Sequence, residues 1–318
     1  MFKRIRRSLL KKFYGENPFL SNVLRKDFSK SPLKYAALSL YLLPVRKMLR
    51  LNEYSKRRTF IVSKDYLEQF HSLLHIGKAE GFNLIRIGDY CGYIMLDDFH
   101  AGGVAYSFGI GDDVSWDRDM ASRGYDVFMY DHTIDGLPEK NPRFHYFREG
   151  IGDGSGENEK LKTLEEYIAR NGHEGQRDMI LKMDVEGAEW GFLESVKPET
   201  LAQFRQITFE LHGMLNGKFP FEQVLELLKK LNKTHQLIHL HPCNWGLSYF
   251  SWGNKNWFNT MEASYIRRDS YTVSDDYAEN LPLSIDRPDA YEWPDIGLGR
   301  WNDSIEYGDM ITSTVTIL

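Results

Sequence analysis

Short apolar segments alternate with helix-like segments between Val104 and His241, and this alternation constrains the fold more than any other feature of the sequence. The predicted strands span 104–108, 126–130, 144–147, 178–183, 206–211 and 237–241. The predicted helices between them span 115–123, 161–171, 189–195 and 221–230. Such alternation is typical of a parallel sheet covered by helices on both faces. We therefore expect an α/β, Rossmann-like fold.

The last two predicted strands differ from the others because no helix separates them. Strands 237–241 and 261–267 lie close together in the sequence. Strands without a crossover helix between them pair in antiparallel fashion. We therefore expect an antiparallel hairpin at one edge of the sheet, and one further helix at 66–78 before the sheet begins.

Charge divides the chain into a basic beginning and an acidic remainder. Residues 1–60 hold 16 Lys and Arg but three acidic residues, whereas the remainder holds 24 basic and 42 acidic residues. We therefore expect a basic helical N-terminal arm over 1–65, an α/β domain over 66–270 and a C-terminal extension over 271–318. The extension is rich in Asp, Glu, Pro, Tyr and Trp, and we expect it to wrap the domain or cover the active site.

The arm has three interpretations. Phe2, Ile5, Leu9 and Phe13 recur at helical spacing between basic residues, which suits docking of residues 1–58 on an anionic membrane surface. The alternatives are a solvated helix that packs on the acidic domain and a targeting segment. Aliphatic rather than stacking aromatic residues stand between the charges, so we expect no nucleic-acid partner.

Other features of the sequence indicate the compartment. No run reaches the roughly 18–20 apolar residues that a membrane-spanning helix needs. The two cysteines, Cys91 and Cys243, can form neither a disulfide framework nor a thiolate zinc site. We therefore expect a cytoplasmic protein, peripheral to a membrane at most.

A glycine-containing loop follows the first strand of the alternating region. In Ser107-Phe-Gly-Ile-Gly111 the glycines allow close approach of a nucleoside-bearing ligand to the backbone. Asp131 lies 22 residues after Gly109, the spacing at which a carboxylate meets ribose hydroxyls. We predict that Ser107, Gly109, Gly111, Asp131 and His132 bind a cofactor.

The loop also indicates the kind of cofactor. The third glycine of a dinucleotide fingerprint is absent. Asp112 and Asp113, one of which is expected to cap the following helix, would repel a pyrophosphate there. A sulfonium nucleoside carries no phosphate, so the loop favours S-adenosylmethionine over NAD.

More polar side chains follow the later strands, where ligands of an open parallel sheet bind. Asp184 and Glu186 follow one strand, and Glu210 and His212 end the next. We predict His212 as the catalytic base, with Asp184 beside it contacting both cofactor and acceptor, and Glu186 and Glu210 as acceptor-binding residues. The less favoured alternative is a divalent metal on Asp184, Glu186 and Glu210.

The strand 237–241 adds a second candidate group. His239 and His241 alternate along it and therefore face the same side. They are predicted to act in catalysis or acceptor binding, with Asn244 and Trp245 as further acceptor-binding residues; the alternative is a hydrogen-bonded structural pair. Aromatic residues suited to stacking on sugar rings follow in a predicted loop. They are Trp245, Tyr249, Phe250, Trp252, Trp257 and Phe258.

One block of the sequence resembles a known family. Lys182-Met-Asp-Val-Glu-Gly-Ala-Glu189 is similar to the signature of FkbM-type S-adenosylmethionine-dependent methyltransferases. Supporting blocks are Arg86-Ile-Gly88 with Gly92-Tyr93, Tyr106–Gly111, Phe209–Gly213, His239–Asn244 and Glu262–Arg267, so the resemblance covers residues 80–270. Ser107 and Phe108 stand where many class I methyltransferases carry an acid, and Tyr90-Cys91 stands where relatives often have Asp-Gly.

The resemblance implies a class I methyltransferase fold and transfer of a methyl group, commonly to a hydroxyl of a sugar or natural product. The predicted acceptor is accordingly a saccharide or glycolipid. Two other classes of function stay open. One is a non-enzymatic Rossmann-like module that binds a nucleotide sugar or a partner, and the other is an NAD-dependent oxidoreductase.

Overall fold

A computed structural model describes residues 59–89, 92–156, 158–215, 219–244, 249–290, 294–307 and 313–316. These residues belong to one compact unit, Arg57–Leu318. The predicted membrane-docking segment 1–58, Tyr90-Cys91 and Trp245 lie outside the described residues. None of the described helices is long and apolar enough to cross a membrane.

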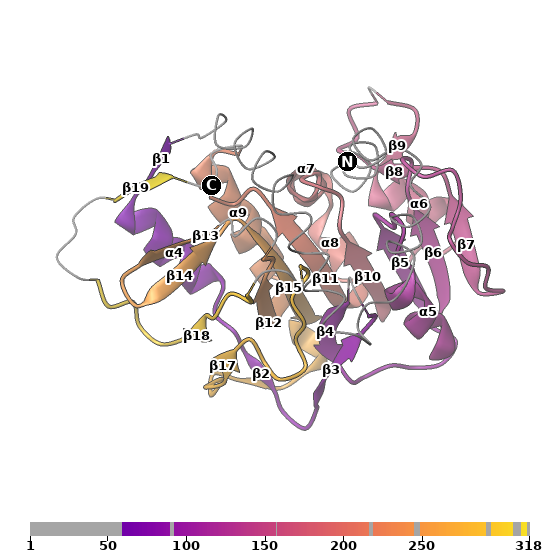
Figure 1. The fold of residues 1–318 in the computed structure, drawn as a ribbon. Coiled ribbons are helices and arrows are strands. Elements are labelled where there is room, and N and C mark those ends of the chain that lie inside the picture. The colour runs from indigo at the N-terminus through magenta and orange to yellow at the C-terminus, as the bar shows by residue number, and fades with distance from the viewer. Residues whose placement is uncertain are drawn as a thin grey trace, which may run out of the picture. The chain divides into compact units, whose positions relative to one another are not determined.

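The centre of this unit is a seven-stranded sheet with the order β12-β15-β11-β10-β5-β6-β7 (Figure 1). Its strands are β5 (Val104–Phe108), β6 (Asp126–Tyr130), β7 (Phe144–Phe147), β10 (Met179–Met183), β11 (Phe204–His212), β12 (His235–Pro242) and β15 (Thr260–Arg267). All neighbouring pairs are parallel except those that include β15. The predicted α/β, Rossmann-like fold is therefore confirmed.

The last two strands pair in antiparallel fashion, but the edge differs from a simple hairpin. β15 enters between β11 and β12 and is antiparallel to both. The connection from β12 to β15 contains a small hairpin of its own, β13 (Tyr249–Trp252) paired with β14 (Lys255–Phe258). This inserted strand places Glu262 between Glu210 of β11 and His241 of β12.

Helices cover both faces of the sheet. They are α4 (Lys64–Leu73), α5 (Ser115–Ser122), α6 (Leu164–Arg170), α7 (Glu189–Ser195), α8 (Pro198–Leu201) and α9 (Phe221–Asn232). Alternate side chains of a strand point to opposite faces. Leu181 and Met183 of β10 therefore join the core that contains α4, α6, α7 and α9, whereas Ile180 joins the core that contains α5.

Two-stranded pairs surround the main sheet and fix the connecting segments. Besides β13 with β14 they are β1 (Thr59–Val62) with β19 (Ser313–Thr316), β2 (Lys78–Ala79) with β16 (Val273–Ser274), β3 (Leu84–Ile87) with β4 (Tyr93–Leu96), β8 (Gly150–Ile151) with β9 (Leu161–Lys162), and β17 (Asn280–Leu281) with β18 (Gly299–Arg300). The C-terminal extension takes part in three of these pairs, so its described part wraps the domain as expected.

Two predicted helices have other boundaries in the structure. The first begins at Lys64, where the Ser63 side chain caps it, and ends at Leu73 rather than Lys78. The helix predicted from residue 161 begins at Leu164, because Thr163 and Glu166 form a capping box that sets the first turn. α5 begins at Ser115 as predicted, but its N-cap is Val114 rather than Asp112 or Asp113, and Asp113 Oδ1 accepts a hydrogen bond from the Ser115 amide.

The predicted sugar-stacking loop is wrong for three of its described members, whereas Tyr249 is 38% exposed and Phe250 is half-buried. Trp252, Trp257 and Phe258 belong to β13 and β14 and are almost fully buried. They pack in the main hydrophobic core together with Trp301 of the C-terminal extension. Because burial of large aromatic side chains is a strong favourable term in folding, these residues stabilise the domain and do not offer a face to a ligand.

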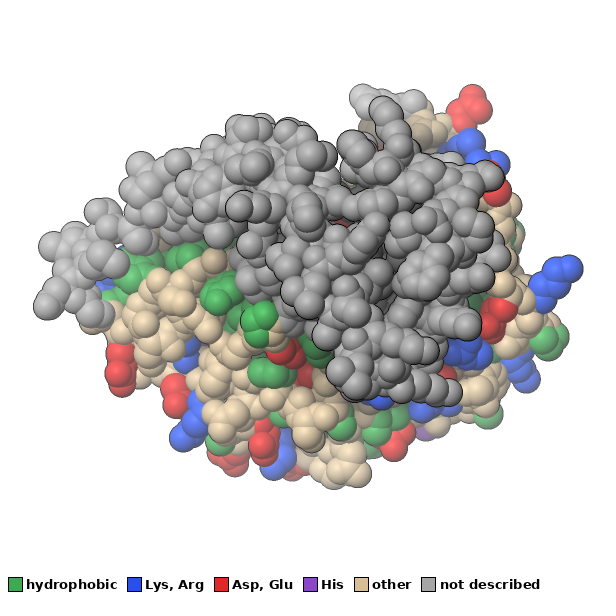
Figure 2. Space-filling model, in the orientation of Figure 1, with side chains coloured by type: hydrophobic (Ala, Val, Ile, Leu, Met, Phe, Trp, Pro, Cys, Tyr) green, Lys and Arg blue, Asp and Glu red, His purple; other side chains and the backbone are tan. Residues whose placement is uncertain are grey.

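Charged side chains of both signs are interspersed over the described surface seen in Figure 2. The visible described residues of that face therefore form no large patch of one sign.

Candidate active site

The glycine loop after β5 is held by its two neighbouring strands. On the β6 side, Asp131 Oδ2 accepts hydrogen bonds from the amides of Ile110 (3.0 Å) and Gly111 (2.9 Å). On the β10 side, the Lys182 ammonium donates to the carbonyl oxygen of Gly109 over 2.9 Å. The loop is thus fixed by an acidic and a basic side chain that are far apart in the sequence.

The two glycines have different physical roles. Gly109 has φ +78°, and a Cβ there would lie 1.6 Å from the carbonyl oxygen of Asp184. Gly109 is therefore required by close packing of the loop against the end of β10. Gly111 also has positive φ, but a Cβ there would meet nothing within 4 Å. Of the two, Gly111 is the one that faces open space.

Asp131 is nearly buried and has a full set of hydrogen bonds. Besides the two loop amides, Oδ1 accepts from the amide (2.8 Å) and the hydroxyl (2.6 Å) of Thr133. Burial would raise the pKa of Asp131, but these hydrogen bonds outweigh it and lower the pKa below its ordinary value. The carboxylate is therefore charged, and it shapes the loop that a ligand would contact.

Two other predicted cofactor residues lie near this loop. Ser107 is fully buried in β5, directly opposite Lys182 of β10, so its side chain lies beneath the loop and not on its outer surface. His132 is half-buried, and a Cβ on Gly150 would come within 2.6 Å of its Nδ1. The prediction that Ser107 touches a cofactor is therefore corrected: it can act only through the residues above it.

The predicted catalytic residues converge at the ends of β10 and β11. One ligand atom from each of Asp184, Glu210 and His212 lies within 4.8 Å of the others. His212 Nε2 is 3.6 Å from Glu210 Oε1 and 3.9 Å from Oε2 of Glu186, whose side chain is 63% exposed. Because Gly109 packs on Asp184, this group borders the glycine loop.

A residue that sequence reasoning did not assign to the site orients His212. Glu189, the first residue of α7, is fully buried, and its Oε1 lies 3.0 Å from His212 Nδ1. The same oxygen accepts a hydrogen bond from the Val185 amide over 2.9 Å. With Nδ1 facing Glu189, the Nε2 atom is the one that faces Glu210 and the sheet end.

The electrostatics of this group are dominated by its acids. Burial alone would lower the pKa of His212, but Glu210, Glu189 and Asp184 raise it to about 10. Burial and the neighbouring Asp184 raise the pKa of Glu210 well above its ordinary value. Perturbed groups that converge at the carboxyl ends of parallel strands are typical of an active site.

Two rows of polar residues cross the sheet at this group, an outer row in which Asp184 and Glu210 are half-buried and an inner row that is buried. In the outer row, Glu210 faces Glu262, and Glu262 faces His241. Asp184, which directly follows β10, extends this row toward the glycine loop. The inner row consists of Ser107, Lys182, Thr208, Ser264 and His239, each the register partner of the next and each buried.

His239 and His241 hold the C-terminal extension and are not open to a ligand. His239 Nε2 is 3.1 Å from Asp286 Oδ2, and both side chains are almost fully buried. His241 is fully buried between Glu262 (3.1 Å) and Asp295 (3.0 Å). The predicted catalytic or acceptor-binding role is corrected to the alternative, structural pairing.

Asn244 is likewise tied to the extension. It is fully buried, donates to the carbonyl oxygens of Ala290 and Pro294, and accepts from the Ala290 amide. Its predicted role in acceptor binding is therefore corrected to anchoring of the extension. The acidic composition of residues 271–318 was the signal for the pairing of His239 with Asp286 and of His241 with Asp295, because a carboxylate can accept a hydrogen bond from a buried histidine.

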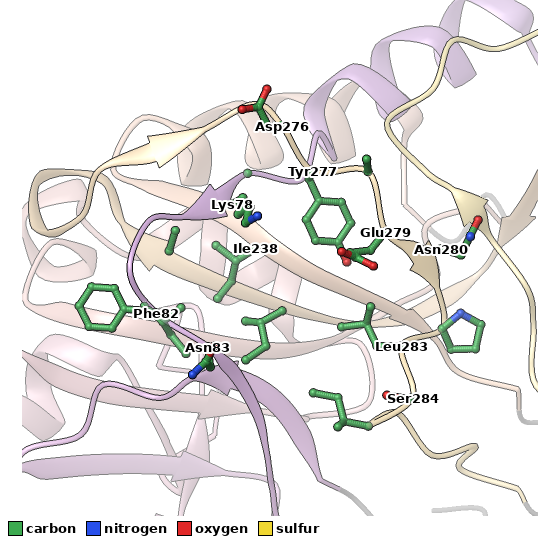
Figure 3. A pocket seen from close by; sticks show the side chains of 17 residues that line it. Lys78, Phe82, Asn83, Ile238, Asp276, Tyr277, Glu279, Asn280, Leu283 and Ser284 are labelled. Carbon is green, nitrogen blue, oxygen red and sulfur yellow. The ribbon is translucent and has the colours of Figure 1, made fainter.

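A cavity of about 550 Å³ lies elsewhere in the domain, between segments 77–84 and 276–285 (Figure 3). Leu84, Leu96 and Ile238 are among its apolar lining residues, and Tyr277 stands over it. Asp184, Glu210 and His212 do not line this cavity. The chemistry is therefore assigned to the strand ends and not to the cavity.

One comparison with known proteins matches the part of the chain that carries the candidate site. Residues 106–235 match the family model described as the methyltransferase FkbM domain. The matched segment contains the glycine loop, Asp131, Asp184 and His212, but not His239, His241 or the C-terminal extension. No curated protein is detectably similar in sequence to this chain.

Solved structures give distant similarities. A protein described as a hemolysin from Streptococcus thermophilus aligns with a TM-score of 0.33 and 10% identity over 55% of this chain and 62% of that one. A protein described as a hemolysin from Lactococcus lactis gives 0.32 and 9%, over 52% and 78%. A protein from Anabaena variabilis, described as a methyltransferase from an antibiotic biosynthesis pathway, gives 0.27 and 13%, over 45% and 61%. This chain spans less than two thirds of the first and third of these proteins.

Alignments at these scores carry no argument about function, and the family assignment rests on the matched segment. The match begins in β5 and ends at the start of β12, so it covers the parallel part of the sheet with the loop and the residues at its carboxyl end. Over residues 106–235 the chain is therefore similar to the methyltransferase FkbM domain.

Proposed function

We propose that this protein transfers a methyl group from S-adenosylmethionine to a hydroxyl of a saccharide or glycolipid. The observation that carries the proposal is the contact between the glycine loop and the Asp184, Glu210 and His212 group. Gly109 packs on Asp184, so a donor on the loop and an acceptor at His212 would be neighbours. A methyl transfer needs this proximity of donor, acceptor oxygen and base.

The loop fits a donor without phosphate groups. A helix-start loop that binds a pyrophosphate uses free backbone amides. Here the amides of Ile110 and Gly111 already donate to Asp131, which is charged. A pyrophosphate at this point would meet a carboxylate instead of free donors, whereas a cationic sulfonium nucleoside suits the acids. This argument disfavours NAD and nucleotide sugars.

When bound, S-adenosylmethionine supplies an electrophilic methyl group on a sulfonium. The chain's own contribution is to hold the acceptor hydroxyl and remove its proton. Glu189 keeps Nδ1 of His212 engaged, so Nε2 would take the proton as the acceptor oxygen forms its bond to the methyl carbon. Glu210 and Asp184 would accept hydrogen bonds from neighbouring acceptor hydroxyls, as carboxylates commonly do.

The raised pKa of His212 sets a condition on this role, because a base must be unprotonated. In the ligand-free protein the surrounding acids hold the proton on His212. A cationic donor beside Asp184 would offset part of this negative charge and lower the pKa of His212. Donor binding would thus release a proton and prepare the base.

A calorimetric titration tests the proposal directly. S-adenosylmethionine and S-adenosylhomocysteine should bind, and NAD and a nucleotide sugar should not. Repeating the titration in two buffers of different ionisation enthalpy should show proton release with S-adenosylmethionine. Binding of NAD alone would replace the proposal with an oxidoreductase, and binding of a nucleotide sugar alone would replace it with a non-enzymatic module. A screen of labelled methyl transfer to glycans and glycolipids identifies the acceptor.

The second candidate mechanism uses a divalent cation. Asp184, Glu210 and His212 offer three ligand atoms of suitable chemistry close together. In that arrangement the metal, and not His212, would lower the pKa of the acceptor hydroxyl. Retention of full activity after chelation favours His212 as base, and loss of activity that Mg²⁺ or Mn²⁺ restores favours the metal.

Membrane attachment through residues 1–58 is a separate part of the proposal. The 16 Lys and Arg of residues 1–60 would attract an anionic surface by roughly 1 kcal/mol for each basic residue near it. Removal of residues 1–58 should abolish sedimentation with anionic liposomes and leave donor affinity unchanged. Equal sedimentation of both proteins would assign the arm to packing instead.

A further inference from the structure

The inner polar row contains a buried lysine whose role is not explained by sequence reasoning. Lys182 is 3% exposed and lies in β10 between Ser107 of β5 and Thr208 of β11. Its ammonium donates to the carbonyl oxygen of Gly109 over 2.9 Å. A buried charge is costly unless it is compensated, so its presence in the centre of the sheet calls for a function.

Asp117 supplies the opposite charge. It lies in α5 and is fully buried. Burial raises the pKa of Asp117, and the charge of Lys182 is the largest influence that opposes this rise. Lys182 lies on the same face of β10 as Ile180, which packs in the core that contains α5, so the helix that follows the glycine loop carries a countercharge on the side that Lys182 faces.

Lys182 donates to the carbonyl oxygen of Gly109, and Asp131 accepts from the amides of Ile110 and Gly111. The Gly109 amide also donates to Tyr130 of β6, over 3.0 Å. Gly109 has φ +78° and presses against Asp184, so the loop has a single close-packed arrangement. Without Lys182, the carbonyl oxygen of the half-buried Gly109 would lose its charged donor, which favours another loop conformation.

We propose that Lys182 is a positioning residue that holds the glycine loop in its donor-binding shape, with Asp117 retained as the countercharge that allows a lysine to be buried there. The proposal rests on the proposed function in one respect, the identity of the donor. Lys182 acts from beneath the loop through Gly109, and contact between Lys182 and the donor is not required.

The test uses the full-length protein and three variants. Lys182→Met removes the hydrogen bond but leaves Asp117 buried and uncompensated. The double variant Lys182→Met with Asp117→Asn removes both charges. Lys255→Met is a matched control, because Lys255 is also 3% exposed and also donates to backbone carbonyls, at Arg300 and Trp301, in another part of the domain.

Three quantities are measured for each variant: the donor Kd by titration calorimetry, the melting temperature, and the deuterium exchange of the peptide that contains residues 106–114 in the ligand-free protein. Lys182→Met should raise the Kd at least tenfold and accelerate exchange in this peptide. The double variant should recover melting temperature relative to Lys182→Met, yet keep the weakened Kd and the fast exchange. Lys255→Met should lower the melting temperature and change neither the donor Kd nor the deuterium exchange of this peptide.

Recovery of both Kd and loop protection in the double variant would overturn the proposal, since Lys182 would then matter only as a partner for Asp117. Equal effects of Lys182→Met and Lys255→Met would overturn it as well. If the wild-type protein binds no S-adenosylmethionine, the proposed function fails. The exchange measurement still decides whether Lys182 holds the loop, because it requires no ligand.

Discussion

His212 Nδ1 lies 3.0 Å from the buried Glu189 Oε1, although the two residues come from different elements, β11 and α7. This contact fixes the imidazole so that Nε2 faces Glu210 and the end of β10. A histidine backed by a buried carboxylate is an arrangement that suits a general base.

Replacement of His212 should separate catalysis from donor binding. General-base assistance is typically worth about 10²–10⁴ in rate, so His212→Ala should lower turnover by that factor. The donor Kd should not rise, because the glycine loop and Asp131 are unchanged and the variant lacks the imidazolium whose proton the donor would displace. Steady-state kinetics and calorimetry measure the two quantities. Full turnover in a folded His212→Ala variant would remove the residue from the base role, and a chelation-sensitive activity would then assign catalysis to a metal.

Glu189 should act through His212 and not on the acceptor. Glu189→Gln keeps the size of the side chain and a hydrogen bond to His212, but removes the charge that favours the imidazolium. We expect a lower turnover with an unchanged acceptor KM, together with a lower pKa of His212 measured by NMR. Because Glu189 is fully buried, circular dichroism should accompany the kinetics. An unchanged pKa of His212 would show that the contact is only structural.

The raised pKa of His212 predicts how activity depends on pH. The proton is held with a pKa of about 10 in the ligand-free protein, so the base form grows as pH rises from 7 to 10. The value of kcat/KM, which reports free-enzyme groups, should therefore increase over that range. His212→Ala should show a flat profile there. A wild-type profile that is also flat would contradict the assignment.

The raised pKa of His212 also makes the stability of the fold depend on pH. The folded-state pKa of His212, about 10, lies above its ordinary value of 6.5. Protonated His212 therefore stabilises the fold fully below about pH 6.5, and this stabilisation is lost as pH rises through 10. The difference in melting temperature between wild type and His212→Ala should shrink across this window. A difference that grows with pH would show that the group is not held in its charged form.

Asp131 should contribute to donor affinity by shaping the loop. Asp131→Ala removes the acceptor of the Ile110 and Gly111 amides, and any contact with the ribose is lost with it. We expect the affinity for S-adenosylmethionine to fall by about 1.5–3 kcal/mol. Thr133→Val is the control, since it removes one donor to Asp131 and leaves the loop contacts in place. An unchanged Kd in a folded Asp131→Ala protein would remove Asp131 from the site.

His241 should behave as a structural residue. His241→Ala leaves Glu262 and Asp295 without their shared partner in a buried place. Breaking such a buried pair typically costs about 3–5 kcal/mol, so the free energy of unfolding in urea should fall by that order. The acceptor KM should change only to the extent that the C-terminal extension loses its attachment to the domain. A selective rise in acceptor KM without loss of stability would return His241 to the acceptor-binding role.

Much of the fold could be predicted from the sequence because it depends on local pattern. Apolar segments of strand length, each followed by Gly or Asp and then by a helical period, specify a parallel α/β sheet wherever they occur. The strand ends could be located in the same way, which is why Asp184, Glu210 and His212 were expected to be neighbours. The block from Lys182 to Glu189 added the family, since its residue order is specific.

The tertiary structure decided what the local pattern does not contain. Whether a polar side chain serves chemistry or architecture depends on its partner, and the partners of His239, His241 and Asn244 lie some 50 residues away in the extension. The sequence pattern indicated an aromatic binding loop, but in the structure Trp252, Trp257 and Phe258 pack in the hydrophobic core with Trp301. In the sequence, Lys182 is one residue of the block that ends at Glu189. The register of β5, β10 and β11 shows that it is buried beneath Gly109. The sequence by itself determined the strands, their ends and the acids and histidines gathered there. Burial and long-range pairing, which depend on the folded arrangement, decided which of those side chains still face a ligand.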